Sequence, residues 1–291
     1  MALQRSSGPH QPDVREVVFK FPIGCKVMVD AAVRLLSLAN QLNHTFRRVR
    51  LEFDEGEAGV MGYFNRMGFF DCLAEDIEVT PDRPFYSSAS LFRGTSDSLV
   101  EIASINPADR IAVQNVPGRL ADALVNACSR RKDIKALEKA AFTVFAELIS
   151  NILDHSSTRL DGFAVLQLYK RKKRKTGSLK VSVSDSGIGI LDTLRPALNT
   201  TDPALAKLTD TELLVEVIRQ GISRHGKTRG QGLKGSAKQA LKYHAQLDVR
   251  LPQSRIVLIP SRTGYEPHKA YSYGDLPLIW GTHISFEFDL T

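Results

Sequence analysis

Apolar residues recur at regular spacing in two separate stretches of the chain, and the first lies near the N-terminus. Its apolar positions alternate in two runs, as in half-buried strands, and recur every three or four residues in two others, as in amphipathic helices. In chain order, the predicted elements are a strand at 15–21, a helix at 29–42, a strand at 48–53 and a helix. The pattern of this last helix covers residues 59–70, and Gly68 is expected to end it. We therefore expect a small α/β module over residues 15–85, preceded by a disordered polar tail of residues 1–14.

The second stretch, residues 117–291, contains two long helical patterns followed mainly by strand patterns. It predicts helices at 117–129, 132–154 and 235–244, and strands at 162–169, 179–185, 246–250, 255–259 and 282–288. Runs of helices followed by runs of strands are typical of α+β domains, here with the helices on one face of a mixed sheet. Residues 86–116, with one predicted strand at 99–105, connect this domain to the N-terminal module.

The composition is that of a globular protein with one large domain or two small ones. The chain has 291 residues, of which 43% are hydrophobic and 24% are charged, and this balance excludes disorder throughout. No apolar run approaches the ~20 residues needed to span a bilayer, and the polar N-terminus lacks the apolar segment of a secretory signal. Three widely separated cysteines, Cys25, Cys72 and Cys128, argue against a disulfide framework. We therefore expect a cytoplasmic protein that does not contact a membrane.

The formal net charge of +7 is concentrated in two basic segments. Lys170–Lys175 is a run of six basic residues between two predicted strands, and Arg219–Lys242 carries seven more and no acid, so the rest of the chain is mildly acidic. An exposed hairpin turn accounts for the first segment, because charges at such a turn stay in water. The alternative is nucleic-acid binding through Lys170–Lys175. It is not favoured, because no cluster of aromatic residues near that run could stack on bases.

Polar residues mark the end of the longest predicted helix. Glu147 and Asn151 are four positions apart and Asp154 follows three positions later, so they share one stripe of the helix beside an apolar stripe. Oxygen ligands from a carboxylate and an amide suit Mg²⁺, which often also binds waters and nucleotide phosphates. An ordinary amphipathic helix with a solvated polar face would show the same pattern, so this motif alone leaves both interpretations open.

A carboxylate and two glycines lie at the end of the strand predicted at 179–185. In the run Asp185-Ser-Gly187-Ile-Gly189, the glycines would let the backbone approach a flat ligand closely. A buried carboxylate there could accept a hydrogen bond from an exocyclic amine such as that of adenine. Turns that end strands often contain Asp and Gly, so the motif is only moderately specific. It is not a Rossmann fingerprint, because a G-x-G-x-x-G run at the start of a helix is missing.

Glycines also precede the last predicted helix, inside the second basic segment. The run G-Q-G-L-K-G at residues 230–235 would present free backbone N–H groups and the positive end of a helix dipole to an anion. Lys227, Arg229 and Lys234 add positive charge nearby. The run is not a Walker A motif, and a flexible surface loop is the alternative interpretation.

In this order, the motifs resemble a known superfamily. E-x-x-x-N-x-x-D-H at 147–155, D-x-G-x-G at 185–189, G-x-G-L at 230–233 and G-T-x-x-x-F at 281–286 resemble the GHKL superfamily (gyrase, heat-shock chaperone, histidine kinase, MutL). The resemblance covers residues 117–291. The form E-x-x-x-N-x-x-D-H-S is most similar to the branch of anti-sigma-factor serine kinases.

The resemblance implies a Bergerat-type α/β sandwich that binds Mg-ATP. On the family pattern, Asn151 would coordinate Mg²⁺ and Asp185 would accept a hydrogen bond from the adenine amine. Thr282 would support Asp185 through a water, and residues 190–229 would form an ATP lid. The nucleotide-binding residues that the resemblance implies are Asn151, Asp154, His155, Asp185, Gly187, Ile188, Gly189, Lys227, Arg229, Gly230, Gln231, Gly232, Leu233, Gly235 and Thr282. The run G-Q-G-L-K-G departs from the G-x-G-L-G that is usual in the kinases.

Three functions remain as hypotheses. The first is an ATP-binding regulatory switch or serine/threonine kinase that acts on a protein partner. The second is an ATP-hydrolysing conformational machine, because Glu147 stands where hydrolysing members carry their general base, although some members with this Glu phosphorylate a protein instead. The third and weakest is the nucleic-acid binder.

The N-terminal module gives a less specific pattern. Its order of strand, helix, strand and helix faintly resembles a STAS domain, which would bind the protein partner, and a generic α/β interaction module is the alternative. Asp54, Glu55 and Glu57 stand where a STAS domain would carry a phosphorylatable Ser or Thr. The superfamily resemblance further implies a homodimer, which the sequence itself leaves open.

Overall fold

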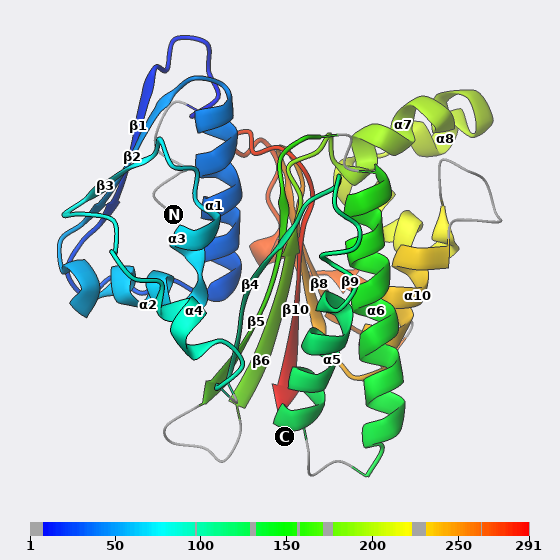
Figure 1. Cartoon of the computed structure of the whole chain (residues 1–291). Helices are drawn as coiled ribbons and strands as arrows, with labels where there is room; N and C mark the ends of the chain where they lie inside the picture. Colours follow the sequence, from blue (N-terminus) through cyan, green and yellow to red (C-terminus); the bar gives the residue numbers. More distant parts are fainter. Residues whose placement is uncertain are drawn as a thin grey trace.

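The computed structural model describes residues 8–96, 98–128, 132–155, 158–170, 177–222, 231–262 and 264–290. Figure 1 shows four layers: a small sheet, a layer of helices, a large sheet and a second layer of helices. The described residues are therefore α+β, as the sequence predicts. None of their helices has both the length and the apolar content that crossing a membrane requires.

The small sheet is parallel, with the strand order β1-β2-β3. The N-terminal elements are β1 (Glu16–Phe21), α1 (Val29–His44), β2 (Arg48–Phe53), η2 (Gly56–Ala58), α2 (Val60–Met67), α3 (Phe69–Cys72), β3 (Glu78–Thr80) and α4 (Ser88–Phe92). Parallel neighbours need crossover connections, and right-handed crossovers in this order place the helices on one face of the sheet. Packed rings, among them Phe21, Phe53 and Phe64, fill the space under that face.

The large sheet is antiparallel throughout, with the order β4-β5-β6-β10-β7-β8-β9. Its strands are β4 (Leu99–Ile105), β5 (Gly162–Lys170), β6 (Gly177–Ser184), β7 (Gln246–Arg250), β8 (Arg255–Pro260), β9 (Tyr265–Pro267) and β10 (His283–Leu290). The prediction of a mixed sheet is therefore wrong. Short connections join β5 to β6, β7 to β8 and β8 to β9, and strands joined in that way run antiparallel.

One face of the large sheet is apolar and lies under helices. These are α5 (Val116–Ala127), α6 (Ile134–His155) and α10 (Gln231–Lys242). Because side chains alternate along a strand, every second residue of β6 and β10 enters this core, for example Val181 and Phe286. The longest helix, α6, contributes Phe145, which is 1% exposed.

The opposite face of the same sheet is polar at its centre and is covered by α1. Ser182, Asp248, Arg250, His283 and Ser285 are all buried, and they alternate with the apolar residues of their strands. Figure 1 shows α1 between the two sheets. The helices α5, α6 and α10 thus lie on one face of the sheet, as expected, and α1 of the N-terminal module covers the second face.

The boundaries differ from the sequence prediction in three places. β3, β9 and α4 were not predicted, because three to five residues are too short for periodicity to show. β4 lies in the expected connecting segment but is an edge strand of the large sheet. Residues 8–14 form turns, and Arg47 donates hydrogen bonds to the carbonyls of His10 at 2.9 Å and Gln11 at 3.1 Å. The expected disordered tail is thus ordered from Gly8 onward.

The chain between β6 and α10 is largely helical. It forms α7 (Ile190–Thr201), α8 (Pro203–Ala206), α9 (Asp210–Glu216) and a π-helical turn, η3 (Val217–Gly221), and a further turn, η4 (Lys269–Tyr271), lies between β9 and β10. Leu194, Leu214 and Val217 of this segment are buried in the core under the apolar face of the sheet.

Candidate functional site

Asp185 directly follows β6, at the end of the large sheet where α7 begins. Its Oδ1 accepts a hydrogen bond from the N–H of Gly187 at 2.7 Å, and its Oδ2 accepts one from the N–H of Thr282 at 3.2 Å. Burial raises the pKa of Asp185 to about 6, although these two hydrogen bonds act to lower it. Each carboxylate oxygen carries a further lone pair, so the group can still accept a hydrogen bond from a ligand.

Two glycines bring other backbone segments close to this carboxylate. Gly281 has a φ of +92°, and a Cβ atom there would lie 2.1 Å from the carbonyl oxygen of Asp185. Gly189 has a φ of +98°, and a Cβ atom there would lie 2.9 Å from Cγ of Pro252. Only glycine satisfies both the conformation and the space. The glycines of the D-x-G-x-G and G-T motifs therefore determine how tightly Asp185 is enclosed.

Thr282 lies next to Asp185 and contacts it through its backbone. The backbone N–H of Thr282, not its hydroxyl, contacts the Asp185 carboxylate directly. The hydroxyl instead accepts a hydrogen bond from the N–H of Ile190 at 2.9 Å. Thr282 therefore connects the start of β10 to both Asp185 and the first turn of α7. Ile188, between the two glycines of the motif, is 53% exposed.

The C-terminal end of α6 lies over the strands that lead to Asp185. A Cβ atom on Gly162 would lie 2.8 Å from Cγ2 of Ile152 and 2.9 Å from the carbonyl oxygen of Ser184. This glycine is thus the place where α6 rests on β5 and β6. Asn151, one residue before Ile152, is half-buried, as is Glu147 one turn earlier. The structure therefore brings the α6 motif and the D-x-G-x-G motif to the same end of the sheet.

The acidic residues of the α6 motif differ in their surroundings. Burial raises the pKa of Glu147, and the negative charge of Asp154 raises it further. Asp154 is bound to other side chains, because its Oδ1 accepts a hydrogen bond from Arg110 at 2.7 Å and its Oδ2 accepts one from Ser150 at 3.0 Å. The sequence analysis missed Arg110. It lies 44 positions before Asp154, and nothing around it in the sequence marks it as a partner.

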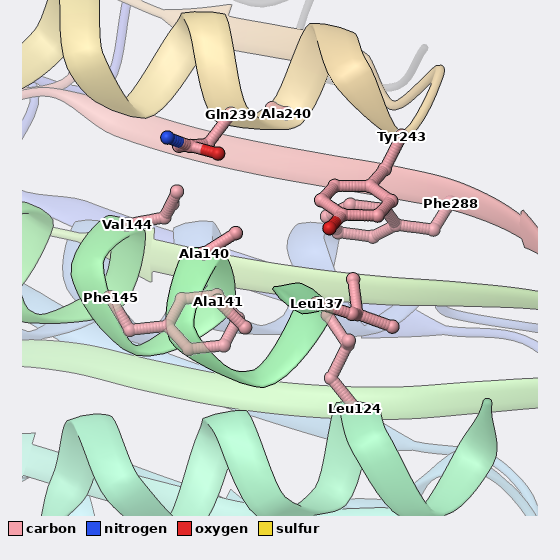
Figure 2. A pocket seen from close by; sticks show the side chains of 10 residues that line it. All are labelled: Leu124, Leu137, Ala140, Ala141, Val144, Phe145, Gln239, Ala240, Tyr243 and Phe288. Carbon is pink, nitrogen blue, oxygen red and sulfur yellow. The ribbon is translucent and has the colours of Figure 1, made fainter. Parts of the chain in front are cut away.

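The contacts between α6 and α10 show that the two helices run antiparallel. In Figure 2, Tyr243 near the end of α10 lies on the side of Leu137, whereas Gln239 lies on the side of Val144. The first turn of α10 is therefore level with the last turns of α6, close to Asn151. The cavity that these helices enclose has a volume of about 10 Å³, far below the ~300 Å³ at the lower end of typical ligand sites. It is a packing gap and not the candidate site.

The third motif lies mostly inside α10 and not before it. The helix begins at Gln231, four residues before the predicted start, so Gly232 and Gly235 are helical. A Cβ atom on Gly235 would meet no heavy atom within 4 Å, and Lys234 donates a hydrogen bond to the carbonyl of Gln220 at 3.3 Å. Of the described residues in this motif, only those in the first turn of α10 have N–H groups without a helical partner, where the predicted anion site would have to lie.

The predicted ATP lid, residues 190–229, is packed into the molecule over most of its length. From Ile190 to Gly221 it forms α7, α8, α9 and η3, and Leu191, Leu198 and Leu213 are buried. The described part of the predicted lid is therefore packed into the core. Residues 223–229 of the predicted lid lie outside the described residues.

Other parts of the predicted site also lie outside the described residues, and their roles stay predictions. This holds for Lys227, Arg229 and Gly230, for the side chains of His155, Gln231 and Leu233, and for residues 171–175 of the basic run Lys170–Lys175.

A cation at this end of the sheet would find few protein ligands. Within the described ranges, no three His, Cys, Asp or Glu side chains are grouped so that they could hold a metal ion. Asn151 and Glu147, one turn apart on α6, present amide and carboxylate oxygens instead. Such a sparse set suits Mg²⁺, which takes many of its ligands from waters and substrate phosphates.

Comparisons with known proteins do not place the chain in a family. No family model matches it, and no curated protein matches it at a significant level. A function must therefore be argued from the chemistry of the site itself.

Proposed function

We propose that this chain binds Mg-ATP at the end of the large sheet, as a member of the GHKL superfamily with a Bergerat-type sandwich. The observation that carries the proposal is the Asp185 carboxylate, half-buried at the end of β6 and held by the N–H groups of Gly187 and Thr282. With a pKa of about 6, this carboxyl group is mainly ionised at neutral pH. It then acts only as an acceptor, which suits the exocyclic amine of adenine.

The phosphate end of the nucleotide would lie toward α6 and α10. The first turn of α10 offers N–H groups and a positive dipole to an anion, and Asn151 is close to it on the neighbouring helix. Asn151 would hold Mg²⁺, which would neutralise phosphate charge. The positive charges of Lys227, Arg229 and Lys234 would act in the same direction.

Two reactions are compatible with the proposed site. The preferred one is a regulatory switch or serine/threonine kinase of the anti-sigma-factor type, in which the phosphoryl group passes to a protein partner. The N-terminal module, with its faint STAS resemblance, would contact that partner. The second is ATP hydrolysis by a conformational machine, and one observation favours it. Burial and Asp154 raise the pKa of Glu147, and a raised pKa brings a carboxylate closer to what general-base catalysis at neutral pH needs.

Nucleotide binding is tested by titration calorimetry with Mg-ATP, Mg-ADP and Mg-GTP. Asp185→Asn should weaken ATP binding by about ten- to a hundredfold, because a hydrogen bond to a charged acceptor is worth about 1.5–3 kcal/mol. Asp71→Asn is a matched control, since Asp71 accepts a hydrogen bond from Ser87 in the N-terminal module and should leave the affinity unchanged. Equal ATP affinity for Asp185→Asn and the unchanged protein would contradict the proposal.

The reaction is distinguished by following the γ-phosphate. If the chain hydrolyses ATP, Glu147→Gln should lower the rate of phosphate release by about 10²- to 10⁴-fold while ATP affinity stays within a factor of about three. If it is a kinase, labelled phosphate should appear on a co-purified protein and not in solution. Phosphate release that is the same in Glu147→Gln would exclude Glu147 as the base.

A further inference from the structure

One buried amide connects the N-terminal module to the candidate nucleotide site. Gln41, in the last turn of α1, is 0% exposed. Its Nε2 donates hydrogen bonds to Ser186 Oγ and to the carbonyl of Trp280, both at 3.0 Å, and its Oε1 accepts one from the N–H of Trp280 at 2.9 Å. All of these partners lie in the domain of the large sheet.

The two segments that Gln41 joins are the ones that enclose Asp185. Ser186 is the next residue after Asp185, and it is also buried. Trp280 is followed by Gly281, which lies so close to Asp185 that an added Cβ atom would be 2.1 Å from the Asp185 carbonyl oxygen. The next residue, Thr282, donates its N–H to the Asp185 carboxylate. A shift of α1 therefore moves both walls around the proposed adenine acceptor.

The other end of α1 is attached to the same sheet by charges. Asp30 forms ion pairs with Arg34 on α1 and with Lys180 on β6, the latter at 3.4 Å, and Arg34 lies 3.6 Å from Asp248 on β7. Burial acts to raise the pKa of Asp30, but Arg34 and Lys180 outweigh it and the pKa is lowered. These contacts hold α1 in one position along the sheet, so Gln41 has a defined place at its far end.

We propose that Gln41 is a positioning residue of the nucleotide site: it holds Ser186 and Trp280, and through them Asp185, so that nucleotide affinity depends on how the N-terminal module is docked. This inference rests on the proposed function. Because coupling between two equilibria is reciprocal, a partner that displaces α1 weakens nucleotide binding, and bound nucleotide strengthens the docking of α1. Partner binding to the N-terminal module then regulates the nucleotide affinity of the other domain.

The contact between Gln41 and the domain of the large sheet includes an intrinsic fluorophore, Trp280. Trp280 is the only tryptophan in the sequence, and His10 of the N-terminal segment stacks on its ring, with centroids 5.0 Å apart. Trp280 fluorescence therefore reports on the contact with Gln41 whether or not nucleotide is present. Saturating Mg-ATP should change the emission and lower its quenching by acrylamide.

The adjacent residue on α1 provides a matched control. Asn40 makes the same kind of two-sided amide contact, donating to the carbonyl of Cys72 at 2.9 Å and accepting from the N–H of Ala74 at 3.0 Å. Both of its partners lie within the N-terminal module. Gln41→Met and Asn40→Leu thus each remove one two-sided amide contact of α1, of a buried side chain and a half-buried one respectively, but only the first removes a contact with the nucleotide site.

The experiment is Mg-ATP calorimetry together with acrylamide quenching of Trp280, on the full chain and these variants. Gln41→Met should weaken ATP binding about tenfold and increase quenching, whereas Asn40→Leu should change neither by more than about twofold. Ser186→Ala removes only one of the hydrogen bonds of Gln41, so it should weaken binding a few-fold. It serves as the test if Gln41→Met does not fold.

Each result has a separate meaning. Unchanged affinity in folded Gln41→Met, or in Ser186→Ala if that variant alone folds, overturns the positioning role of Gln41. An equal loss in Asn40→Leu also overturns it, because the effect then comes from general loosening of the module. No ATP binding by the unchanged chain overturns the proposed function itself, and with it this inference. The unchanged chain thus distinguishes the two failures.

Discussion

The two faces of the large sheet are made by the same strands but differ in chemistry. Under α5, α6 and α10, the strands present apolar side chains such as Val181 and Phe286. Under α1, the neighbouring positions are Ser182, Asp248 and His283, all buried. Apolar burial is stabilising in proportion to the area removed from water and has no preferred direction, whereas hydrogen bonds and ion pairs depend on distance and angle.

The two faces therefore contribute differently to the fold. The apolar face contributes most of the buried apolar surface that stabilises the domain. The polar face fixes where α1 sits, because a buried charge or amide without its partner is costly. Arg255 donates to Asp248 at 2.7 Å, and Arg34 of α1 lies on the same carboxylate, so a displaced α1 would leave this group partly unpaired. Buried polar contacts thereby make the docking of the N-terminal module specific.

The largest effect is expected on the apolar face. Phe145→Ala should lower the free energy of unfolding by about 3–5 kcal/mol, because it removes a fully buried ring and leaves a cavity. Phe142→Ala on the same helix is the control, since Phe142 is 49% exposed and should lower it by less than about 1 kcal/mol. Urea unfolding measures both. Similar losses for the two variants would show that α6 does not rest on the sheet as described.

A smaller loss, with a different consequence, is expected on the polar face. Asp248→Asn should lower the free energy of unfolding by about 3 kcal/mol, because it leaves Arg255 without its anion and Arg34 with Asp30 alone. The exposed pair Arg48–Glu78, at a similar distance of 2.8 Å, gives the control Glu78→Gln, with an expected loss below about 1 kcal/mol.

The same variant separates cohesion from positioning. Asp248→Asn should also increase acrylamide quenching of Trp280, since α1 loses part of its attachment, whereas Phe145→Ala should not at temperatures where it is folded. A quenching constant that is unchanged in Asp248→Asn would argue against a positioning role for the polar face.

The smallest effect is expected at Asp185, at the end of the inner strand β6, and it depends on pH. The pKa of Asp185 is about 6 in the folded protein, compared with an ordinary value of 3.8. Between these two pH values the folded protein therefore binds more protons than the unfolded chain. Its contribution to stability is therefore present below about pH 4 and is lost as the pH rises through about 6, a change of up to about 3 kcal/mol. Asp185→Asn should lack this component.

Urea unfolding of both proteins at pH 4, 5, 6 and 7 measures the Asp185 component as a difference, in which the titration of all other groups cancels. A difference that stays constant across these pH values would show that Asp185 is not buried in the way the structure describes. The same residue would then also be a poor acceptor for a ligand in a dry site.

Much of the secondary structure could be predicted from the sequence, because long periodic patterns report which side of an element is buried. The strand Arg48–Phe53 and the end of α2 at Gly68, where φ is +83°, follow directly from the pattern. The short strands β3 and β9 could not be found, since three residues show no period. The pattern places the start of α10 too late, because Gly232 and Gly235 are poor helix formers and yet both are helical.

The candidate site shows the same limit. Asp185, Gly189 and Gly281 could be singled out because few residue types satisfy an enclosed turn. Arg110 and Gln41 could not, since an arginine in a loop and a glutamine on a helix are common and their importance comes only from distant partners. Gln41 contacts Trp280, 239 positions later in the chain, and no local pattern carries that information.

By itself, the sequence determined the order of strands and helices, the two charged segments and the residue types gathered in the motifs, because these depend on local spacing and side-chain chemistry. Only the tertiary structure decided that the large sheet is antiparallel, that residues 190–221 of the predicted lid pack into the core, and that α1 covers the polar face of the sheet. These outcomes depend on which surfaces bury each other across long separations in the chain. Their free energies come from contacts formed only in the folded protein.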